Sequence, residues 1–383
     1  MSVYLDYNST APIDSRVLDF MINIYKNVIG NPDSRTHNYG DEARKTVENA
    51  RSEVAEILKI NKDEVFFTSG ATESNNIVFQ GLKDYARKSG KNQIITTSIE
   101  HKSILETSKH LENEGFVINY IKPNADGLIS LEEIKNLITE KTLLVAVMHV
   151  NNETGVIQPV KEIGDFLKSK DILFHIDATQ SFGKLVNELQ NIKYNTMSMS
   201  AHKIGGPQGI GALILRKNNY RLPPIKGIMY GGQQEHGIRP GTVPVALVAA
   251  LGYACKLASQ EYIQNNTKCL EIKNAILSEL KCSGLNYTIN GDINSTIYST
   301  INICIKGVSS EALMLSTKNY CSISNGSACN SKSYKPSYVL LSMGLNESDI
   351  ENSIRISWGP TSNLEEILPS FRNMLIVAKQ LAL

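Results

Sequence analysis

Short apolar runs rich in β-branched residues alternate along much of the chain with longer stretches in which apolar residues recur at helical spacing. Short runs bounded by polar residues are typical of buried strands, and longer periodic stretches are typical of amphipathic helices. We expect strands at residues 64–68, 93–97, 143–149, 173–177, 196–200 and 212–215, and helices at residues 41–58, 73–89, 102–114, 131–138 and 160–169. This alternation predicts an α/β fold with a mostly parallel sheet between helices.

A second unit follows a long helical pattern at residues 245–280, which breaks at Ser283 and Gly284. Beyond it we expect a strand at residues 300–305 and helices at residues 311–316 and 364–381. We therefore place a domain boundary inside the long helix. The expected large domain covers residues 15–255, and the expected small domain covers residues 1–14 together with residues 256–383.

The composition is that of an ordinary globular protein, with 42% hydrophobic and 20% charged residues and a formal net charge of +1. Because this charge is close to zero, we expect no direct binding to nucleic acid and no attraction to a membrane surface. The N-terminus lacks a basic start followed by an apolar stretch, and no apolar run is long enough to span a bilayer. We therefore expect a soluble cytosolic protein. The six cysteines form no CxxC pair, which argues against a zinc knuckle and against a thioredoxin-type redox pair.

Three segments that follow expected strands carry candidate chemistry, because ligands of parallel sheets bind at the carboxyl ends of the strands. The first is TSGATESNN at residues 68–76, where a strand end turns into a helix start. The amides of a helix's first turn attract phosphate, and small residues allow a close approach. The alternative interpretation is an ordinary turn with a hydroxyl N-cap.

The second segment is HIDATQS at residues 175–181, which places Asp177 at the end of an apolar strand, and the third is SAHKIGGPQG at residues 200–209. In the third, Lys203 follows a strand end and precedes a Gly-rich loop, so its amine could reach the crevice. Taken singly, Asp177 could be a helix N-cap and Lys203 a solvated loop lysine.

The three segments together favour a pyridoxal-5′-phosphate (PLP) enzyme. The first would hold the phosphate, Asp177 would keep the pyridine nitrogen protonated, and Gln180 could donate to the phenolic oxygen. Lys203 would bind the cofactor as a Schiff base, which requires a neutral amine and hence a lowered pKa. Ser200 and His202 could also bind the phosphate.

The chain resembles the NifS/IscS cysteine desulfurases, which are fold-type I PLP enzymes. The resemblance runs almost end to end and includes YLDYNSTAPID, SGATESNN, IEHKSI, MHVNNETGVIQP, HIDATQS, SAHKIGGPQG, RPGT, SNGSACNS, KPSYVL and SIRIS. It implies a mostly parallel seven-stranded sheet in a large PLP-binding domain, with a smaller α/β domain that carries a catalytic cysteine loop.

The resemblance also implies a role for each site residue. Lys203 would carry PLP, His101 would stack on the ring and move protons, and Arg355 would bind the substrate carboxylate. Without the surrounding motifs, Arg355 would be interpreted as part of a surface salt bridge and His101 as a solvent-exposed histidine at a helix start. The expected cofactor contacts are Ala71, Thr72, His101, Asn152, Asp177, Gln180, Ser200, His202 and Lys203, with Thr242 contributed by the second subunit of a homodimer; Asn152 would also lie near the substrate.

Cys329 is the expected nucleophile. It lies among small and polar residues in SNGSACNS, which is typical of an exposed loop. Cys304 lies in an alternating apolar run and is expected to be buried, and Cys321 is the second choice for the nucleophile. The predicted reaction converts L-cysteine to L-alanine and leaves a persulfide on Cys329 for an acceptor protein. A selenocysteine lyase or another class V lyase or aminotransferase is the alternative enzyme, and an inactive scaffold is the alternative from another class.

Some positions depart from the family pattern. His236 stands where an arginine is usual, so phosphate or dimer contacts are expected to differ there. Trp358-Gly359-Pro360 drops an arginine near the strand that holds Arg355. These departures are compatible with a specialised sulfur donor, for tRNA thiolation or DNA phosphorothioation, and iron–sulfur cluster assembly stays open as the third pathway.

Overall fold

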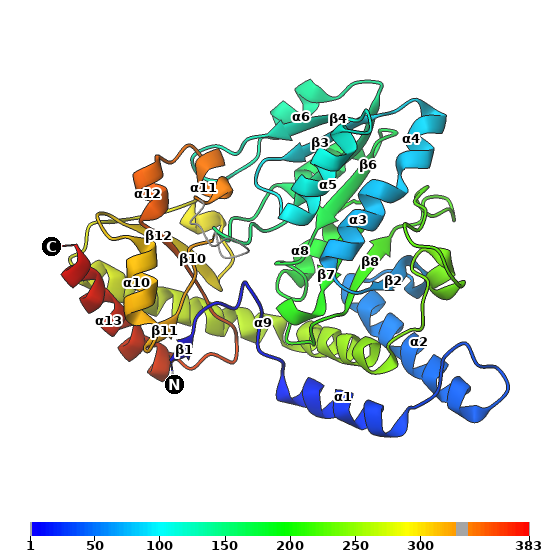
Figure 1. Ribbon diagram of the computed structural model, residues 1–383, viewed down its shortest axis with the longest axis horizontal. Helices are drawn as coiled ribbons and strands as arrows, with labels where there is room; N and C mark the ends of the chain where they lie inside the picture. Colours follow the sequence, from blue (N-terminus) through cyan, green and yellow to red (C-terminus); the bar gives the residue numbers. More distant parts are fainter. Residues whose placement is uncertain (1, 327–335, 383) are drawn as a thin grey trace.

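The computed structural model describes residues 2–326 and 336–382, and its largest element is a seven-stranded sheet with the strand order β2-β8-β7-β6-β5-β3-β4 (Figure 1). Neighbouring strands are parallel except at β8, which runs antiparallel to both β7 and β2. The strands are β2 (Val65–Thr68), β3 (Gln93–Thr97), β4 (Val117–Ile121), β5 (Thr142–Met148), β6 (Leu173–Asp177), β7 (Thr196–Ser200) and β8 (Gly211–Leu215).

Helices cover both faces of this sheet, because successive side chains of its buried strands point to opposite sides. Phe66 and Leu144 pack with α3 (Ala71–Gly81), α4 (Lys83–Ser89) and α5 (Lys102–Glu112). Phe67 and Val145, one position further along, pack in the core on the other face. That face is covered by α2 (Asn38–Leu58), α6 (Leu131–Leu137), α7 (Val160–Leu167), α8 (Val186–Asn191) and the start of α9 (Val245–Cys282). The predicted α/β class and mostly parallel sheet are confirmed.

Three expectations about the large sheet and the helices around it need correction. The helix expected at residues 73–89 is two helices, because α3 ends at Gly81, where a Cβ atom would overlap the carbonyl oxygen of Lys226. Strand β4 was not predicted because it lies at the sheet edge and its side chains are mostly partly exposed, so it lacks a buried apolar run. Helix α1 (Ser15–Asn27) was also missed, since it buries only Val17 and Ile24.

A smaller unit is built on the antiparallel sheet β12-β10-β9, from β9 (Tyr287–Ile289), β10 (Thr300–Ile305) and β12 (Ser353–Ser357). Beside it, β1 (Val3–Tyr4) pairs in parallel with β11 (Cys321–Ser322). The helices of this part are α10 (Ser310–Thr317), α11 (Tyr338–Ser342), α12 (Glu347–Glu351) and α13 (Leu364–Leu381). Helix α9 runs from the large sheet to this unit (Figure 1). In the smaller unit, the N-terminal strand β1 and the C-terminal helix α13 lie close together (Figure 1). In the described ranges, no helix is both long and apolar enough to cross a membrane.

Candidate active site

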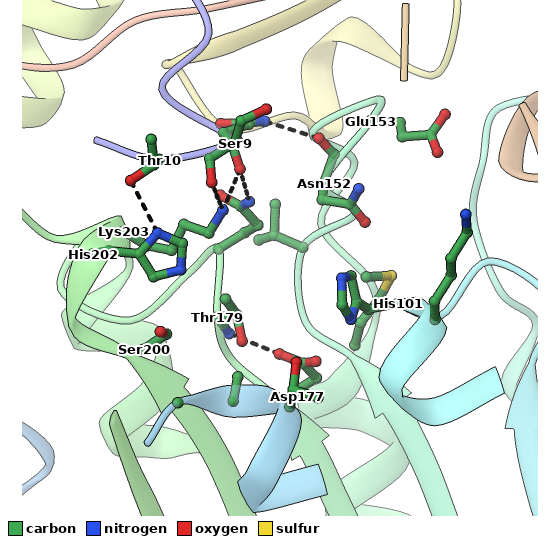
Figure 2. A pocket seen from close by; sticks show the side chains of 18 of the residues that line it. Ser9, Thr10, His101, Asn152, Glu153, Asp177, Thr179, Ser200, His202 and Lys203 are labelled. Atoms are coloured by element: carbon green, nitrogen blue, oxygen red, sulfur yellow. Dashed lines mark hydrogen bonds between the residues drawn. The ribbon is translucent and has the colours of Figure 1, made fainter. Parts of the chain in front are cut away.

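A cavity of about 790 Å³ opens at the carboxyl ends of the parallel strands and extends to β12 of the smaller unit (Figure 2). Most of the predicted site residues line it: Ala71, Thr72, His101, Asn152, Asp177, Gln180, Ser200, His202, Lys203 and Arg355. Thr242 is exposed and does not line it. Cys329 lies outside the described residues, whereas Gly326 and Ser337, on either side of that gap, both line the cavity.

The start of α3 forms one wall of the cavity. Its N-cap is Gly70, and no side chain caps the first turn within the described part of the chain. The alternative of a hydroxyl N-cap is therefore wrong here. First-turn amides without a capping side chain are donors for an anion. Ser200, which has 6% of its surface exposed, lines the same cavity.

Asp177 ends β6 with only 4% of its surface exposed. Its Oδ1 accepts from the Thr179 amide at 2.9 Å, and its Oδ2 accepts from the Asn75 side chain at 2.9 Å. The first bond closes a local turn after the strand and caps no helix, because the next helix, α8, begins at Val186, so the helix N-cap alternative is wrong. The second comes from α3 and fixes the carboxylate in the cavity wall, where it can pair with a cationic ring nitrogen.

Lys203 lies in a short 3₁₀ turn, η2 (Ala201–Lys203), directly after β7. Its Nζ donates to the carbonyl oxygens of Asn8 and, at 2.6 Å, of Ser9 (Figure 2). Burial lowers the pKa of Lys203 to about 7, and the cations Lys184 and Arg355 act in the same direction. A substantial neutral fraction at neutral pH suits an amine that must act as a nucleophile. Lys203 is therefore not an ordinary solvated loop lysine.

His101 caps α5, and its Nδ1 accepts from the Ser103 amide at 3.2 Å. Its side chain lines the cavity and is exposed there, and desolvation by the neighbouring residues lowers the pKa of His101. His202, beside Lys203, contacts the Thr10 hydroxyl at 3.1 Å, and burial lowers its pKa to about 4. Both rings are therefore neutral at neutral pH.

Arg355 projects from β12 with 4% of its surface exposed, so the surface salt bridge alternative is wrong. One Nη donates to Asp6 at 2.6 Å and to Ser9 at 2.8 Å, and the other donates to the Asn152 carbonyl oxygen at 3.0 Å. Its buried Nε has no partner among the described residues. A buried guanidinium with a donor to spare suits a carboxylate ligand.

Several cavity residues received no specific role from the sequence. Asn8, Ser9 and Thr10 come from the N-terminal segment and contact the site lysine, arginine and histidine. Glu153 follows Asn152 and is 1% exposed. The only signal for them was their place inside long family motifs, because their partners lie far away in the sequence.

These residues fit PLP. The cavity is of the size that holds a cofactor-sized ligand. The start of α3 would hold the phosphate, the fixed carboxylate of Asp177 would pair with the ring nitrogen, and the amine of Lys203, with its lowered pKa, would bind the aldehyde. The Asn152 side-chain oxygen is a second buried polar atom without a partner among the described residues, as expected of a group that contacts a ligand.

Comparison with known proteins agrees with this site. Residues 3–368 match the family described as Aminotransferase class-V. The chain is 40% identical over 385 residues to the cysteine desulfurase IscS of Vibrio vulnificus (strain CMCP6), and the match covers 100% of this chain and 94% of that protein. It superposes on a solved NifS-like protein with a TM-score of 0.90 at 33% identity, covering 99% of this chain and 100% of that one. It also superposes on a solved structure described as SspA in complex with cysteine, at a TM-score of 0.81 and 33% identity. This match covers 94% of the present chain and 100% of the SspA chain.

The match to the family extends over almost the whole chain. The alignment with the IscS relative covers nearly the full length of both proteins. The resemblance to the NifS/IscS enzymes and the predicted cofactor are both confirmed by these matches. This chain belongs to the class-V aminotransferase family and, within it, to the PLP-dependent cysteine desulfurases.

Proposed function

We propose that this desulfurase converts L-cysteine to L-alanine, holds the released sulfur as a persulfide on Cys329, and passes it to an acceptor protein. The observation that carries the proposal is the convergence of Asp177, Lys203 and Arg355 on one cavity, each from a different element. When bound, PLP supplies an electron sink for the substrate's Cα. The chain supplies the binding, orientation and proton transfers.

Arg355 binds the substrate carboxylate through its unpaired Nε, and the solved complex of the similar protein SspA with cysteine supports this substrate class. Lys203 Nζ, whose pKa burial lowers to about 7, would take the proton from the substrate's Cα. Asp177 would hold the pyridine nitrogen of the bound cofactor in its protonated form. The removal of a proton therefore falls to an amine that the cavity itself keeps partly neutral.

Cys329 is proposed as the nucleophile for sulfur. Its thiolate would attack the substrate sulfur, so that an S–S bond forms, the substrate C–S bond breaks, and the electron pair of that bond goes to the carbon, which takes up a proton to become the alanine methyl group. None of the five described cysteines lines the cavity. Cys321, the second choice, is buried, which raises the pKa of its thiol to about 11, and this argues against a thiolate there.

A Cys329→Ser variant, compared with Cys282→Ser at an exposed cysteine, tests this assignment. We expect Cys329→Ser to keep the yellow lysine-bound cofactor and to lose both enzyme-bound persulfide and alanine formation, while Cys282→Ser keeps all three. Turnover of cysteine by Cys329→Ser at the parent rate would refute the nucleophile. A comparison of the persulfide left on the parent enzyme after cysteine and after selenocysteine separates the alternative lyase, which releases alanine without needing the thiol.

We further propose a homodimer in which Thr242 reaches the phosphate of the partner's site. Its exposed position outside its own cavity, and exposed apolar residues such as Tyr25 and Ile29, support this. Sedimentation analysis together with a Thr242→Val variant tests the proposal. A monomeric enzyme, or unchanged PLP affinity in the variant, would refute it.

We propose the cytosol as the location of the protein, since a reducing compartment suits its five described free cysteines.

The division into residues 15–255 and residues 1–14 with 256–383 also stays a proposal. A separate hydrophobic cluster that joins Leu5 to residues from Cys269 onward supports it. Val339 and Ile350 depart from the division, because they pack in the core of the large sheet. Limited proteolysis, with cuts expected outside both cores, would test the boundary.

A further inference from the structure

The side chain of Asn75 connects two groups of the active site. Asn75 lies on α3, is fully buried, and does not line the cavity. Its Nδ2 donates to Asp177 Oδ2 at 2.9 Å and to Ser103 Oγ at 2.8 Å, and its Oδ1 lies 2.9 Å from His175 Nε2. An amide nitrogen has two hydrogens, so both are used.

The direction of these bonds follows from Asp177, because an ionised carboxylate can only accept. The Asn75 nitrogen must therefore face Asp177, and its oxygen must accept from His175 Nε2–H. The other ring nitrogen of His175 lies 2.8 Å from the Thr196 hydroxyl, which can donate to it. Burial lowers the pKa of His175 to about 4, so this ring is a neutral anchor for Asn75.

The same reasoning extends to His101 through Ser103. The Ser103 hydroxyl accepts from Asn75, so its single hydrogen is left for His101 Nδ1, 2.9 Å away. The Ser103 backbone amide also donates to that Nδ1, at 3.2 Å. A nitrogen that accepts two hydrogen bonds cannot carry a proton, so the neutral ring carries its hydrogen on Nε2.

We propose that Asn75 is a positioning residue that links Asp177 to His101 and fixes His101 as the Nε2–H form, a hydrogen-bond donor towards cofactor and substrate. The nature of these ligands rests on the proposed function, whereas the tautomer rests on the hydrogen bonds alone. His101 thus enters the reaction as a donor and not as a base.

The charges around His101 bear on the same point. Burial lowers its pKa, Asp177 opposes this effect, and Lys203 and Lys102 add to it. A proton added at Nδ1 would also face the fixed N–H of the Ser103 backbone. These contacts disfavour the imidazolium form of His101.

The test uses the cofactor-loaded enzyme labelled with ¹⁵N-histidine, in which the two ring nitrogens report tautomer and pKa. A His101→Gln spectrum identifies the signal among the seven histidines. The variants are Asn75→Ala, which cuts both links, and Ser103→Ala, which cuts only the link to His101. The matched control is Asn76→Ala, next to Asn75 but bonded to Thr72 and Thr107.

We expect His101 to be Nε2–H in the parent enzyme. Asn75→Ala should raise the His101 pKa by about half to one unit and weaken PLP binding about tenfold. Ser103→Ala should raise the His101 pKa and leave PLP affinity unchanged, and Asn76→Ala should change neither. Melting temperatures show that each variant is folded.

Three results would overturn the proposal: an Nδ1–H tautomer in the parent, an Asn75→Ala variant with unchanged His101 pKa and PLP affinity, or a loss of PLP affinity in Ser103→Ala equal to that in Asn75→Ala. Failure of the proposed function is distinct. It would appear as a parent enzyme that forms no alanine from cysteine, whatever the state of the histidine.

Discussion

Replacing Glu153 with glutamine should change how the stability of the protein depends on pH. Glu153 is 1% exposed beside the cavity, and its Oε2 accepts from the Ser337 hydroxyl at 2.5 Å. Gly326 packs so closely that a Cβ atom there would overlap the same carboxyl group. Glu153 therefore contacts a described residue on each side of the segment that contains Cys329.

The expected size of the effect follows from the carboxyl pKa. Burial raises the pKa of Glu153 from 4.5 to about 7, although Ser337 and Arg355 act against it. Between these values the folded protein keeps a proton that the unfolded chain has lost, so stability falls as pH rises and is level above about pH 7. The difference corresponds to about 3 kcal/mol. A glutamine side chain has the same shape, still accepts from Ser337, and does not titrate.

The assay compares melting temperatures of the parent and Glu153→Gln at about pH 5 and about pH 8.5. The two should be close at the lower pH, and the variant should melt several degrees higher at the upper pH. Glu100, whose pKa burial raises to about 8, titrates in both proteins and cancels in the difference. Glu132→Gln, at an exposed side chain, controls for the substitution itself. A difference between parent and Glu153→Gln that is independent of pH would refute the reasoning.

Three further substitutions test other parts of the structure. Arg51→Met should lower the melting temperature and cost about 3–5 kcal/mol of stability. It leaves Glu235, which is 8% exposed, without the two Arg51 Nη atoms that donate to its carboxylate oxygens at 2.7 and 2.8 Å, and adding Glu235→Gln should restore part of the loss. Arg355→Lys should raise the KM for cysteine about tenfold or more with PLP affinity unchanged, since lysine cannot replace the spare Nε donor. Gly81→Ala should cost about 1–3 kcal/mol in thermal unfolding, because its Cβ would overlap the backbone of Lys226 and also come too close to the Ile225 side chain.

The sequence predicted those elements whose environment is uniform along their length. Strands β3, β6 and β7 begin and end where expected because buried apolar or small residues fill them and polar residues or turns bound them. At the end of α3, Gly81 lies against the backbone of Lys226, which is far away in the sequence, so local periodicity could not indicate this contact.

The site divides in the same way. Asp177 and Lys203 were predictable because each lies at or directly after the end of a buried strand, and strand ends in a parallel sheet meet at one edge. The role of Asn75 was not predictable, because its partners at positions 103, 175 and 177 come from other elements. Only the folded chain shows that an asparagine in the TSGATESNN segment also fixes the carboxylate of Asp177.

The positions that depart from the family pattern, at His236 and residues 358–360, do not line the active-site cavity. Along β12, Ile354, Ile356 and then Trp358 point into the core of the smaller unit, and the Trp358 indole donates to the Cys269 carbonyl oxygen at 3.0 Å. Arg355 points the other way, into the cavity, as the two-residue period of a strand requires. His236 is exposed in a turn with φ 54° and also lies outside the cavity lining. Changes at Trp358 and His236 therefore alter packing and surface contacts, and residues 358–360 also line a second pocket that reaches Lys203.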